Sequence, residues 1–460
     1  MKKSLIAVAL LLSSLTNAAA SDNTTAAKDN YPATAWEHYA ADEYAGGTGT
    51  KDDPYLIATP EQLMKLAVEI ENKAMADDNW DDDSGLGYSV GKYFKQTADL
   101  VFNANVLKLV SSDSYGDPSI VADEGLRTFD GIGYNAGEYD YQRFRGVYDG
   151  GGHSISGLYC KGGKSATGLF NFAQGAVIKN LVIKDSYLSA NANVGLVVGY
   201  ADNTTIINCQ TSGMIYCGGS YHAGIAGTIT NGSKLLNCVT DAQTWAKNNC
   251  GGIVGTARFA STVANCYYGG WLGGVKSNLG KFKFYGAVCP ELGLSEAVTE
   301  TPDPENPETM ITTCENPSKA INVYWTDTCT VRYVRDKDNP RNWAKAPAFN
   351  DAENCKFGVF ENCKAVALAD MASTVAALNA QAEKTDGASK WKVGDNGLPT
   401  LEFDNTVTGI AQVVKDNENS KCDVYSVQGI LIKESMTKKD ALHGLRRGVY
   451  IVNGKKIVVR

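Results

Sequence analysis

Short apolar runs alternate with glycine and polar positions through the middle of the chain, and they recur at a fixed interval. A glycine followed by two apolar residues opens each unit, at Gly168, Gly195, Gly224 and Gly252, which are 27, 29 and 28 residues apart. Each unit also holds a second, β-branched run, such as Thr205-Ile-Ile in the second unit. Self-similarity at one period indicates stacked units of supersecondary structure.

Two further residue types keep the same phase. An asparagine recurs at intervals of 28, 29 and 28 residues, at Asn180, Asn208, Asn237 and Asn265. A cysteine follows three of them, as Cys209, Cys238 and Cys266. Runs of this length bounded by Gly, Asn, Asp and Ser are typical of strands, and the many glycines disfavour helix. The period therefore predicts the coils of a β-helix.

Stacking of coils would explain why these residues hold their phase. Parallel coils lie about 4.8 Å apart, so equivalent residues stand one above another. Each glycine allows either a positive φ or a close approach of neighbouring coils. Each asparagine tolerates the left-handed region at a bend and can bond to the amide one coil away. We expect the three cysteines to be buried free thiols, because stacked parallel Cβ vectors rarely suit a disulfide torsion.

These coils resemble the GLUG repeats of bacterial surface proteins. Residues 144–158, with the sequence FRGVYDGGGHSISGL, are similar to the coil that commonly precedes such repeats. The resemblance covers about residues 46–290. It implies an all-β fold, a right-handed parallel β-helix (solenoid), with a helix-containing N-terminal cap over 46–142 and repeats over 143–290. It implies no single activity.

The cap contains one clear helix signal. Thr59, Pro60 and Gln62 have the spacing of an N-cap, a first-turn proline and a capping box. An apolar helical face follows, formed by Leu63, Leu66, Ala67 and Ile70. Residues 103–142 have the composition of an inserted loop. A cap is physically required, because an open terminal coil would present unpaired strand edges.

The segment before the cap has the features of an export signal. Two lysines, an apolar stretch and Ala18-Ala19-Ala20 predict a signal peptide over residues 1–20, and polar residues 21–45 predict a flexible leader. No later apolar run is long enough for a transmembrane helix. The formal charge of −8 becomes −10 when Lys2 and Lys3 are removed. This acidity argues against nucleic acid and anionic membrane surfaces as partners.

The repeat pattern fades after Cys266. Residues 291–309 are an acidic, proline-rich linker or loop, and 310–404 are expected to be the C-terminal section of the β-helix. Within that section, Asp370 to Gln381 is predicted to be a helix with three apolar residues facing inward, namely Met371, Val375 and Leu378. In similar proteins a helix and a Trp…Gly-x-Pro-x-Leu phrase, here Trp391 to Leu401, end the β-helix.

The tail, residues 405–460, is expected to be a separate β-module. Val424 to Ile432 indicates a strand, a turn and a strand, and Gly448 to Arg460 indicates a hairpin with Asn453-Gly454 at its turn. This order resembles the C-terminal (Por) sorting domain of the type IX secretion pathway of Bacteroidetes. The resemblance implies the type IX machinery as a partner and an extracellular or outer-membrane location. An ordinary small β-module is the alternative.

Cysteines, histidines and one acidic stretch are the polar groups that could form disulfides or metal sites. The 12 cysteines of an exported chain suggest some disulfides, with Cys355–Cys363 and then Cys314–Cys329 as the best local pairs. Four histidines without a shared motif give no zinc site. The acidic stretch 77–85 offers oxygen ligands for calcium but lacks the EF-hand spacing and the closing Glu, so a solvated loop after a helix is the favoured interpretation. We therefore expect neither metal nor cofactor.

Catalysis and binding make different demands on the same fold. The strand cores between Gly168 and Gly270 are nearly free of charge, and Asp185, Asp202 and Asp241 do not hold one phase. One mixed charged cluster stands before the repeats, formed by Arg143, Arg145, Asp149 and His153. Asp149 precedes three glycines and suits a turn, although Asp149 and His153 would be the first residues to mutate in a test for catalysis. No catalytic residue is assigned.

Aromatic residues at coil ends or in turns offer a binding surface. They are Tyr216, Tyr221, Tyr267, Tyr268 and Trp271. Such rings either stack on a ligand or cap the hydrophobic core. We therefore predict a secreted or cell-surface, non-catalytic solenoid, adhesin-like in binding a glycan or protein. The alternative is a carbohydrate-active β-helix enzyme, a polysaccharide lyase or glycoside hydrolase, and a purely structural envelope component is a third possibility.

The sorting prediction can be tested by truncation. Deletion of residues 424–460 should leave the protein in the periplasm, because the machinery that reads the tail would have no signal. Fractionation of expressing cells measures this. Normal release of the truncated chain would refute a sorting role for the tail.

Overall fold

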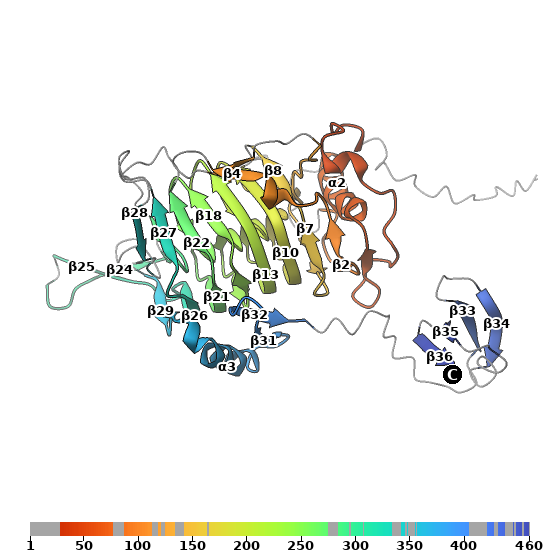
Figure 1. The fold of residues 1–460 in the computed structure, drawn as a ribbon. Helices are drawn as coiled ribbons and strands as arrows, with labels where there is room; N and C mark the ends of the chain where they lie inside the picture. The colour runs from red at the N-terminus through yellow and green to blue at the C-terminus, as the bar shows by residue number, and fades with distance from the viewer. Residues whose placement is uncertain are drawn as a thin grey trace, which may run out of the picture.

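The computed structural model describes most of the chain between residues 28 and 459. The described ranges are 28–76, 87–112, 118–120, 125–133, 142–162, 165–274, 284–293, 296–306, 308–333, 342–345, 347, 355, 357–403, 421–426, 431–437, 445, 448–452 and 455–459. These residues are mostly β-strands in parallel sheets, with two α-helices (Figure 1). The signal peptide, the acidic stretch 77–85 and the turn at Asn453-Gly454 lie outside the described residues.

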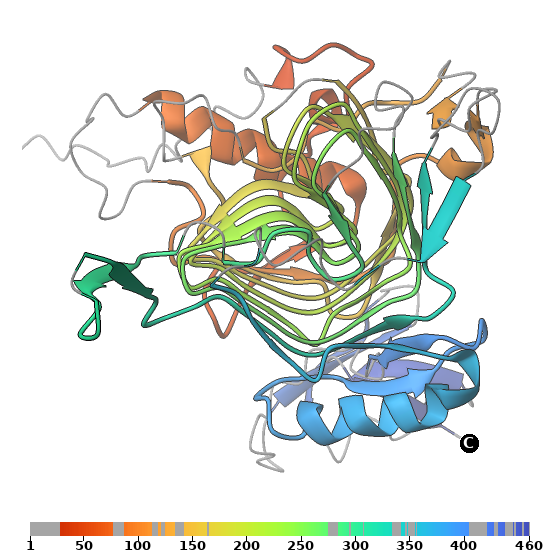
Figure 2. The same ribbon diagram turned by 90° about the vertical axis from the view of Figure 1, so that its left-hand side faces the viewer.

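Three parallel sheets are built from the repeats, and the chain visits them in the same order in each coil. The second sheet holds β9 (Phe170–Gln174), β12 (Val198–Asp202), β15 (Ala226–Thr230) and β20 (Val254–Ala257). The third holds β11 (Val194–Gly195), β14 (His222–Ala223), β19 (Cys250–Gly251) and β23 (Tyr285–Gly286). Viewed along the stack, these passes superimpose (Figure 2), an arrangement consistent with a β-solenoid.

The first sheet is the largest and runs the length of the stack. It begins with β1 (Tyr55–Ile57), β2 (Tyr93–Gln96), β3 (Leu100–Val101), β6 (Val147–Asp149), β7 (Ser154–Ser156) and β8 (Tyr159–Lys161). It continues with β10 (Val177–Ala190), β13 (Thr205–Cys217), β16 (Lys234–Leu236), β17 (Val239–Thr240), β18 (Gln243–Ala246), β21 (Thr262–Tyr268) and β22 (Trp271–Gly274). It ends with β26 (Lys319–Thr326), β27 (Thr330–Tyr333), β28 (Asn342–Lys345), β29 (Val359–Glu361) and β30 (Lys364–Val366).

The repeated asparagines form one column at a bend of the first sheet, as predicted. All four have positive φ, between 52° and 55°. Asn208 donates through Nδ2 to Asn180 Oδ1 at 2.8 Å, Asn237 to Asn208 at 2.8 Å, and Asn265 to Asn237 at 2.7 Å. Asp149 continues the column at one end, where its Oδ1 accepts from Asn180 Nδ2 at 2.9 Å. The side-chain ladder thus fixes the register of successive coils.

The recurring glycines permit close approach between coils, whereas positive φ is not needed there. A Cβ on Gly195 would lie 2.5 Å from the Ile225 carbonyl oxygen, and one on Gly252 would lie 2.1 Å from the Ala287 carbonyl oxygen. Their φ angles are not in the left-handed region. Neighbouring coils therefore approach too closely at these positions for a side chain to fit.

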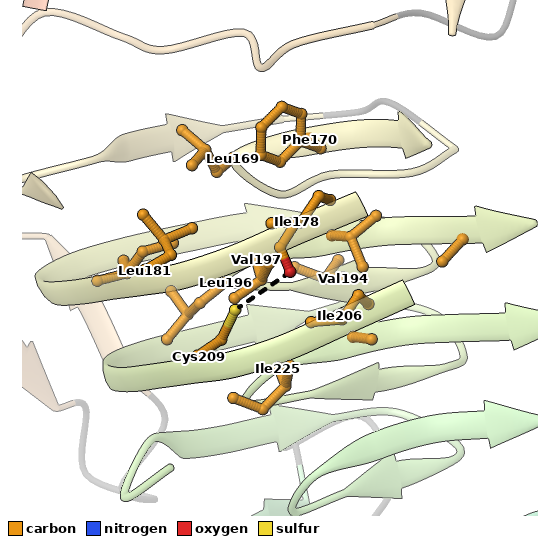
Figure 3. Close-up of a cluster of buried hydrophobic side chains, with 14 of the residues drawn as sticks. Leu169, Phe170, Ile178, Leu181, Val194, Leu196, Val197, Ile206, Cys209 and Ile225 are labelled. Carbon is orange, nitrogen blue, oxygen red and sulfur yellow. Dashed lines mark hydrogen bonds between the residues drawn. The ribbon is translucent and has the colours of Figure 1, made fainter. Parts of the chain in front are cut away.

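The recurring cysteines are free thiols in the core, as predicted. Figure 3 shows Cys209 among apolar side chains of adjacent coils, including Leu181, Leu196 and Ile206. Burial raises the pKa of the Cys209 and Cys266 thiols. These thiols therefore stay protonated and act as small apolar side chains.

The N-terminal cap closes one end of the stack (Figure 1). Its helix α2 (Pro60–Ala76) starts where predicted, and Gln62 N donates to Thr59 Oγ1 at 3.3 Å. The predicted face Leu63, Leu66, Ala67 and Ile70 is buried. The described part of the 103–142 insertion contains η2 (Val106–Leu109) and a hairpin of β4 (Val110–Ser112) with β5 (Pro118–Ile120).

Two predictions from the sequence are wrong, one about the segment before the N-terminal cap and one about the disulfide bonds. Residues 28–45 are not a flexible leader, because η1 (Trp36–Tyr39) buries Trp36 against Phe102 in the cap. The proposed partners Cys355, Cys363, Cys314 and Cys329 form no disulfide. Cys363 follows Asn362, whose Nδ2 donates to Asn322 Oδ1 at 2.7 Å, and the Cys363 thiol donates to the Ala320 carbonyl at 3.3 Å. Cys314 follows the exposed strand β25.

The segment after the last described coil covers the side of the stack and does not close its end. It consists of η5 (Leu368–Asp370), α3 (Met371–Ala382), β31 (Lys390–Val393) and β32 (Pro399–Glu402). We call residues 367–403 the C-terminal cover. Met371 and Leu378 are buried and Val375 is partly buried, as predicted. Figure 2 shows α3 alongside the coils, which corrects the expectation that this helix ends the β-helix.

The cover sits on the asparagine column. Ser389 N donates to Asn208 Oδ1 at 2.9 Å, and Trp391 Nε1 donates to Asn237 Oδ1 at 2.6 Å. Asn265 Nδ2 donates to the Leu378 carbonyl at 3.1 Å. Three groups of the column therefore find partners in a segment more than 100 residues further along the chain, while Asn265 Oδ1 has no hydrogen-bond partner among the described residues.

The remaining elements are two antiparallel units. The acidic, proline-rich segment is a loop whose ends pair as β24 (Thr299–Pro302) with β25 (Met310–Thr313). The tail forms a four-stranded antiparallel sheet of β33 (Lys421–Ser426), β34 (Leu431–Thr437), β35 (Gly448–Val452) and β36 (Lys455–Val459). The pairing of β33 with β34 and of β35 with β36 agrees with the predicted strands on either side of the two turns.

Replacing a stacked asparagine should lower stability, and the loss should be larger at a buried position than at an exposed one. Asn237→Ala deletes four side-chain hydrogen bonds, three of them buried, and places alanine in a left-handed conformation, so the free energy of unfolding should fall by about 3–4 kcal/mol. Asn362→Ala is the control, since Asn362 has the same φ but is exposed, and should cost about 1–2 kcal/mol. Chemical denaturation measures both. Equal losses would contradict a stabilising ladder.

The burial of His222 should make the stability of the fold depend on pH. Complete burial in β14 lowers its pKa to about 4. The unfolded chain therefore binds this proton first, and stability should fall by about 3 kcal/mol as pH drops from about 6.5 to about 4. His222→Leu should flatten the curve of unfolding free energy in that window. An unchanged slope would exclude His222 as its source.

Candidate functional site

One face of the first sheet presents a regular array of outward side chains beyond the asparagine bend. Strands β13, β17–β18 and β21–β22 lie side by side there (Figure 1). Alternate residues point outward, so each strand gives one residue to each of four rows. From the bend outward the rows are Gln210, Val239, Tyr267; Ser212, Asp241, Gly269; Met214, Gln243, Trp271; and Tyr216, Trp245, Gly273.

The first two rows form a polar groove with the C-terminal cover. The groove has a volume of about 460 Å³, and the turn between β31 and β32 forms its opposite wall. Thr400 Oγ1 donates to Gln210 Oε1 at 2.7 Å, which ties that wall to the sheet. A Cβ on Gly269 would meet Leu398 Cδ1 at 2.7 Å and Asp241 Cβ at 3.6 Å. The groove thus exists partly because residue 269 has no side chain.

Charged groups of both signs line this polar groove. Asp241 lies on the sheet side, and Lys392 and Asp395 lie on the cover side. Solvent reaches all three side chains, yet desolvation by the surrounding protein raises the pKa of Asp241. The groove therefore offers carboxylate acceptors and an ammonium donor to a polar ligand.

The outer two rows are aromatic. Trp245 and Trp271 pack edge to face, with ring centroids 5.0 Å apart at 83°. The Trp245 ring lies over Gly273, where a Cβ would be 2.4 Å from Cε3. Tyr216 and Trp271 are partly exposed, and Trp245 is 6% exposed. We call Met214, Tyr216, Gln243, Trp245 and Trp271 the aromatic rows.

The structure separates the five predicted binding aromatics. Tyr216 and Trp271 belong to the aromatic rows. Tyr267 and Tyr268 are both 0% exposed, which corrects the expectation that they are surface rings. Adjacent residues of a strand point to opposite faces, so Tyr268 enters the core while Tyr267 points outward and is buried by the cover. Tyr221 lies elsewhere, with the Arg258 guanidinium 4.7 Å from its ring centroid.

The charged cluster before the repeats has structural partners. Asp149 Oδ1 accepts from Gly151 N at 2.9 Å as well as from Asn180, which supports its role as a turn former. His153 Nδ1 lies 3.8 Å from Asp99 Oδ1, and Arg143 Nη1 lies 3.9 Å from Asp202 Oδ2. Arg145 donates its backbone N–H to Ser89 Oγ. Each of these four residues therefore contacts a different neighbour.

Within the ranges that the structure describes, no group of three or more His, Cys, Asp or Glu residues is placed to hold a metal ion. Over the same residues, no helix has the length and apolar character needed to cross a membrane.

Sequence reasoning missed several residues of this face. Trp245 stands one coil after the predicted Tyr216, at the same position of the period, so the period could have revealed it. Asp241 was noted only for not holding a common phase with other acids. Lys392 and Asp395 carry no signal, because a contact between residues about 150 positions apart follows from the packing of the cover.

Comparisons with known proteins give one distant structural match. A crystal structure from Bacteroides ovatus, described as a "putative immunoglobulin A1 protease", superimposes with a TM-score of 0.44 and 17% sequence identity. The match covers 78% of this chain and 95% of that chain. A likeness this distant supports no inference about activity. No protein-family model and no curated protein match the chain.

Removing the hydroxyl group should have opposite effects on the free energy of unfolding at the two buried tyrosines, Tyr267 and Tyr268. Tyr267 Oη has no partner in hydrogen-bonding geometry among the described residues, although nearby Thr326 opposes the rise in its pKa that burial causes. Tyr268 Oη donates to the Ala242 carbonyl at 3.2 Å. Tyr267→Phe should leave the free energy of unfolding unchanged or raise it by up to about 1 kcal/mol, and Tyr268→Phe should lower it by about 1 kcal/mol. The reverse order in denaturation would contradict the burial argument.

Proposed function

We propose that this protein is a secreted or surface-displayed, right-handed β-solenoid of the GLUG type that binds a glycan without turning it over. The observation that carries the proposal is the continuity of the polar groove with the aromatic rows on one sheet face. Sugars present hydroxyl groups at their edges and C–H groups on their faces, so a carbohydrate site needs both polar groups and flat rings. Export by the type IX pathway through the C-terminal β-module is part of the same proposal.

A glycan fits this face better than a protein partner does. The centres of protein interfaces are depleted of charged residues and are well packed. Here Asp241, Lys392 and Asp395 stand beside the groove. Ligand sites for small molecules combine apolar walls with a few placed polar groups, in pockets of about 300–1,000 Å³. The groove falls in that range.

One observation favours the enzyme alternative enough to require a test. Asp241 and Asp395 line the same groove, and glycoside hydrolysis uses two carboxyl groups at a defined separation. A raised pKa such as that of Asp241 suits a general acid. Incubation with a polysaccharide panel, followed by detection of new chain ends, decides between the two. Turnover that disappears in Asp241→Asn would replace the binding proposal with a hydrolase.

The aromatic rows give the direct test of binding. Trp271→Ala and Tyr216→Ala should each weaken binding to the glycans selected on an array by about tenfold, because each removes a partly exposed ring from the face. Calorimetry on the purified mature chain measures this. Tyr200→Ala is the matched control, since Tyr200 is also partly exposed and stacks on Phe172 at 5.3 Å, but on the second sheet.

These variants must be compared at equal stability. Melting temperatures of the three variants identify any that lose affinity by unfolding. Unchanged affinity in both Trp271→Ala and Tyr216→Ala, with intact folds, would remove the aromatic rows from the site. A protein that selects no glycan on the array, with the fold intact, would overturn the proposed function.

A further inference from the structure

The polar groove is closed at the asparagine bend. Its first row lies beneath the C-terminal cover, where Val239 is 6% exposed and Tyr267 is 0% exposed. Gln210 Oε1 accepts from both Thr400 Oγ1 at 2.7 Å and Leu401 N at 3.4 Å, so the cover is joined to the sheet at this end. A long ligand therefore has no path past the first row.

Among the described residues, the opposite end of the face is the more open one, with Met214 and Tyr216 packed on one side against the cluster of Val106, Tyr159 and Tyr187. The aromatic rows continue the same strands outward, and Tyr216 and Trp271 are partly exposed. Four residue steps separate Ser212, in the second row, from Tyr216, which corresponds to about 13 Å along an extended strand. Three coils span about 10 Å in the perpendicular direction. The accessible face is thus longer along the strands than across them, with polar groups at the closed end and rings at the open end.

From this geometry we infer that the site recognises the end of a glycan chain. Resting on the proposed function, the inference adds which part of the glycan is bound. The terminal sugar occupies the polar groove beside Ser212, Asp241 and Lys392, and the following sugars lie along the aromatic rows. The two carboxylates Asp241 and Asp395 and the single ammonium of Lys392 offer acceptors and a donor, and their excess of negative charge disfavours an acidic sugar. The expected terminal sugar is therefore uncharged.

Chain length gives the first measurement. Oligosaccharides from one to six units, prepared from the glycan that the array selects, are titrated against the wild-type mature chain by calorimetry. Affinity per chain should rise over the first few units and then stay constant up to the polymer. A bulky label on one chain terminus should abolish binding, and the same label on the other terminus of a hexasaccharide should not.

Two variants separate the ends of the site. Gly269→Leu places a side chain between Leu398 and Asp241 and should weaken binding at every length by about tenfold or more. Trp271→Ala should weaken only the longer oligosaccharides and leave the single sugar unchanged. The control for glycine replacement is Gly218→Leu, because a Cβ there would meet only Asn191 Oδ1, at 3.9 Å. Melting temperatures show whether each variant is folded.

The results that would overturn recognition of a chain end differ from those that would overturn glycan binding itself. Affinity per chain that keeps rising in proportion to polymer length, or tolerance of labels at both termini, would show internal binding and overturn the inference while leaving glycan binding intact. Gly269→Leu with wild-type affinity would equally exclude the groove. Failure of the wild-type chain to bind any oligosaccharide would instead overturn the proposed function itself.

Discussion

The structure depends on one constraint, namely that equivalent residues of successive coils must lie in register along the stack. Parallel backbone pairing at about 4.8 Å leaves register free to slip by two residues, so something else must fix it. The asparagine column does so, because each amide donates to the next at 2.7–2.8 Å and each backbone is held in the left-handed region. The glycines then allow the coils to approach closely, and the buried thiols fill the interior.

The same column determines where the binding face lies. Its outward hydrogen-bonding groups would be costly to bury without partners. The C-terminal cover supplies these partners through Ser389, Trp391 and the Leu378 carbonyl. Because the cover is anchored there, its β31–β32 turn reaches over the next outward rows and forms the wall of the groove. A structural requirement at the bend thus positions the functional groups beside it.

The division of the aromatic residues follows from the same geometry. A strand residue points either into the core or out of it, and outward residues near the bend are covered while those further along are not. Tyr268, Tyr267 and Trp271 therefore have three different environments although they lie within five residues of one another. Local composition makes them look alike, since each is an aromatic residue near the end of a short apolar run.

The sequence by itself determined the stacking of the coils, the asparagine bend, the capping helix and the separate terminal β-module. These features depend on local backbone preferences and on a period, and both can be read along the chain. Only the tertiary structure decided that residues 28–45 are ordered, that the proposed disulfide pairs do not form, and that α3 lies on the side of the stack. It also decided which aromatic rings are exposed. The physical reason is that these outcomes depend on contacts between segments far apart in the chain, such as Trp391 with Asn237, for which no local pattern exists.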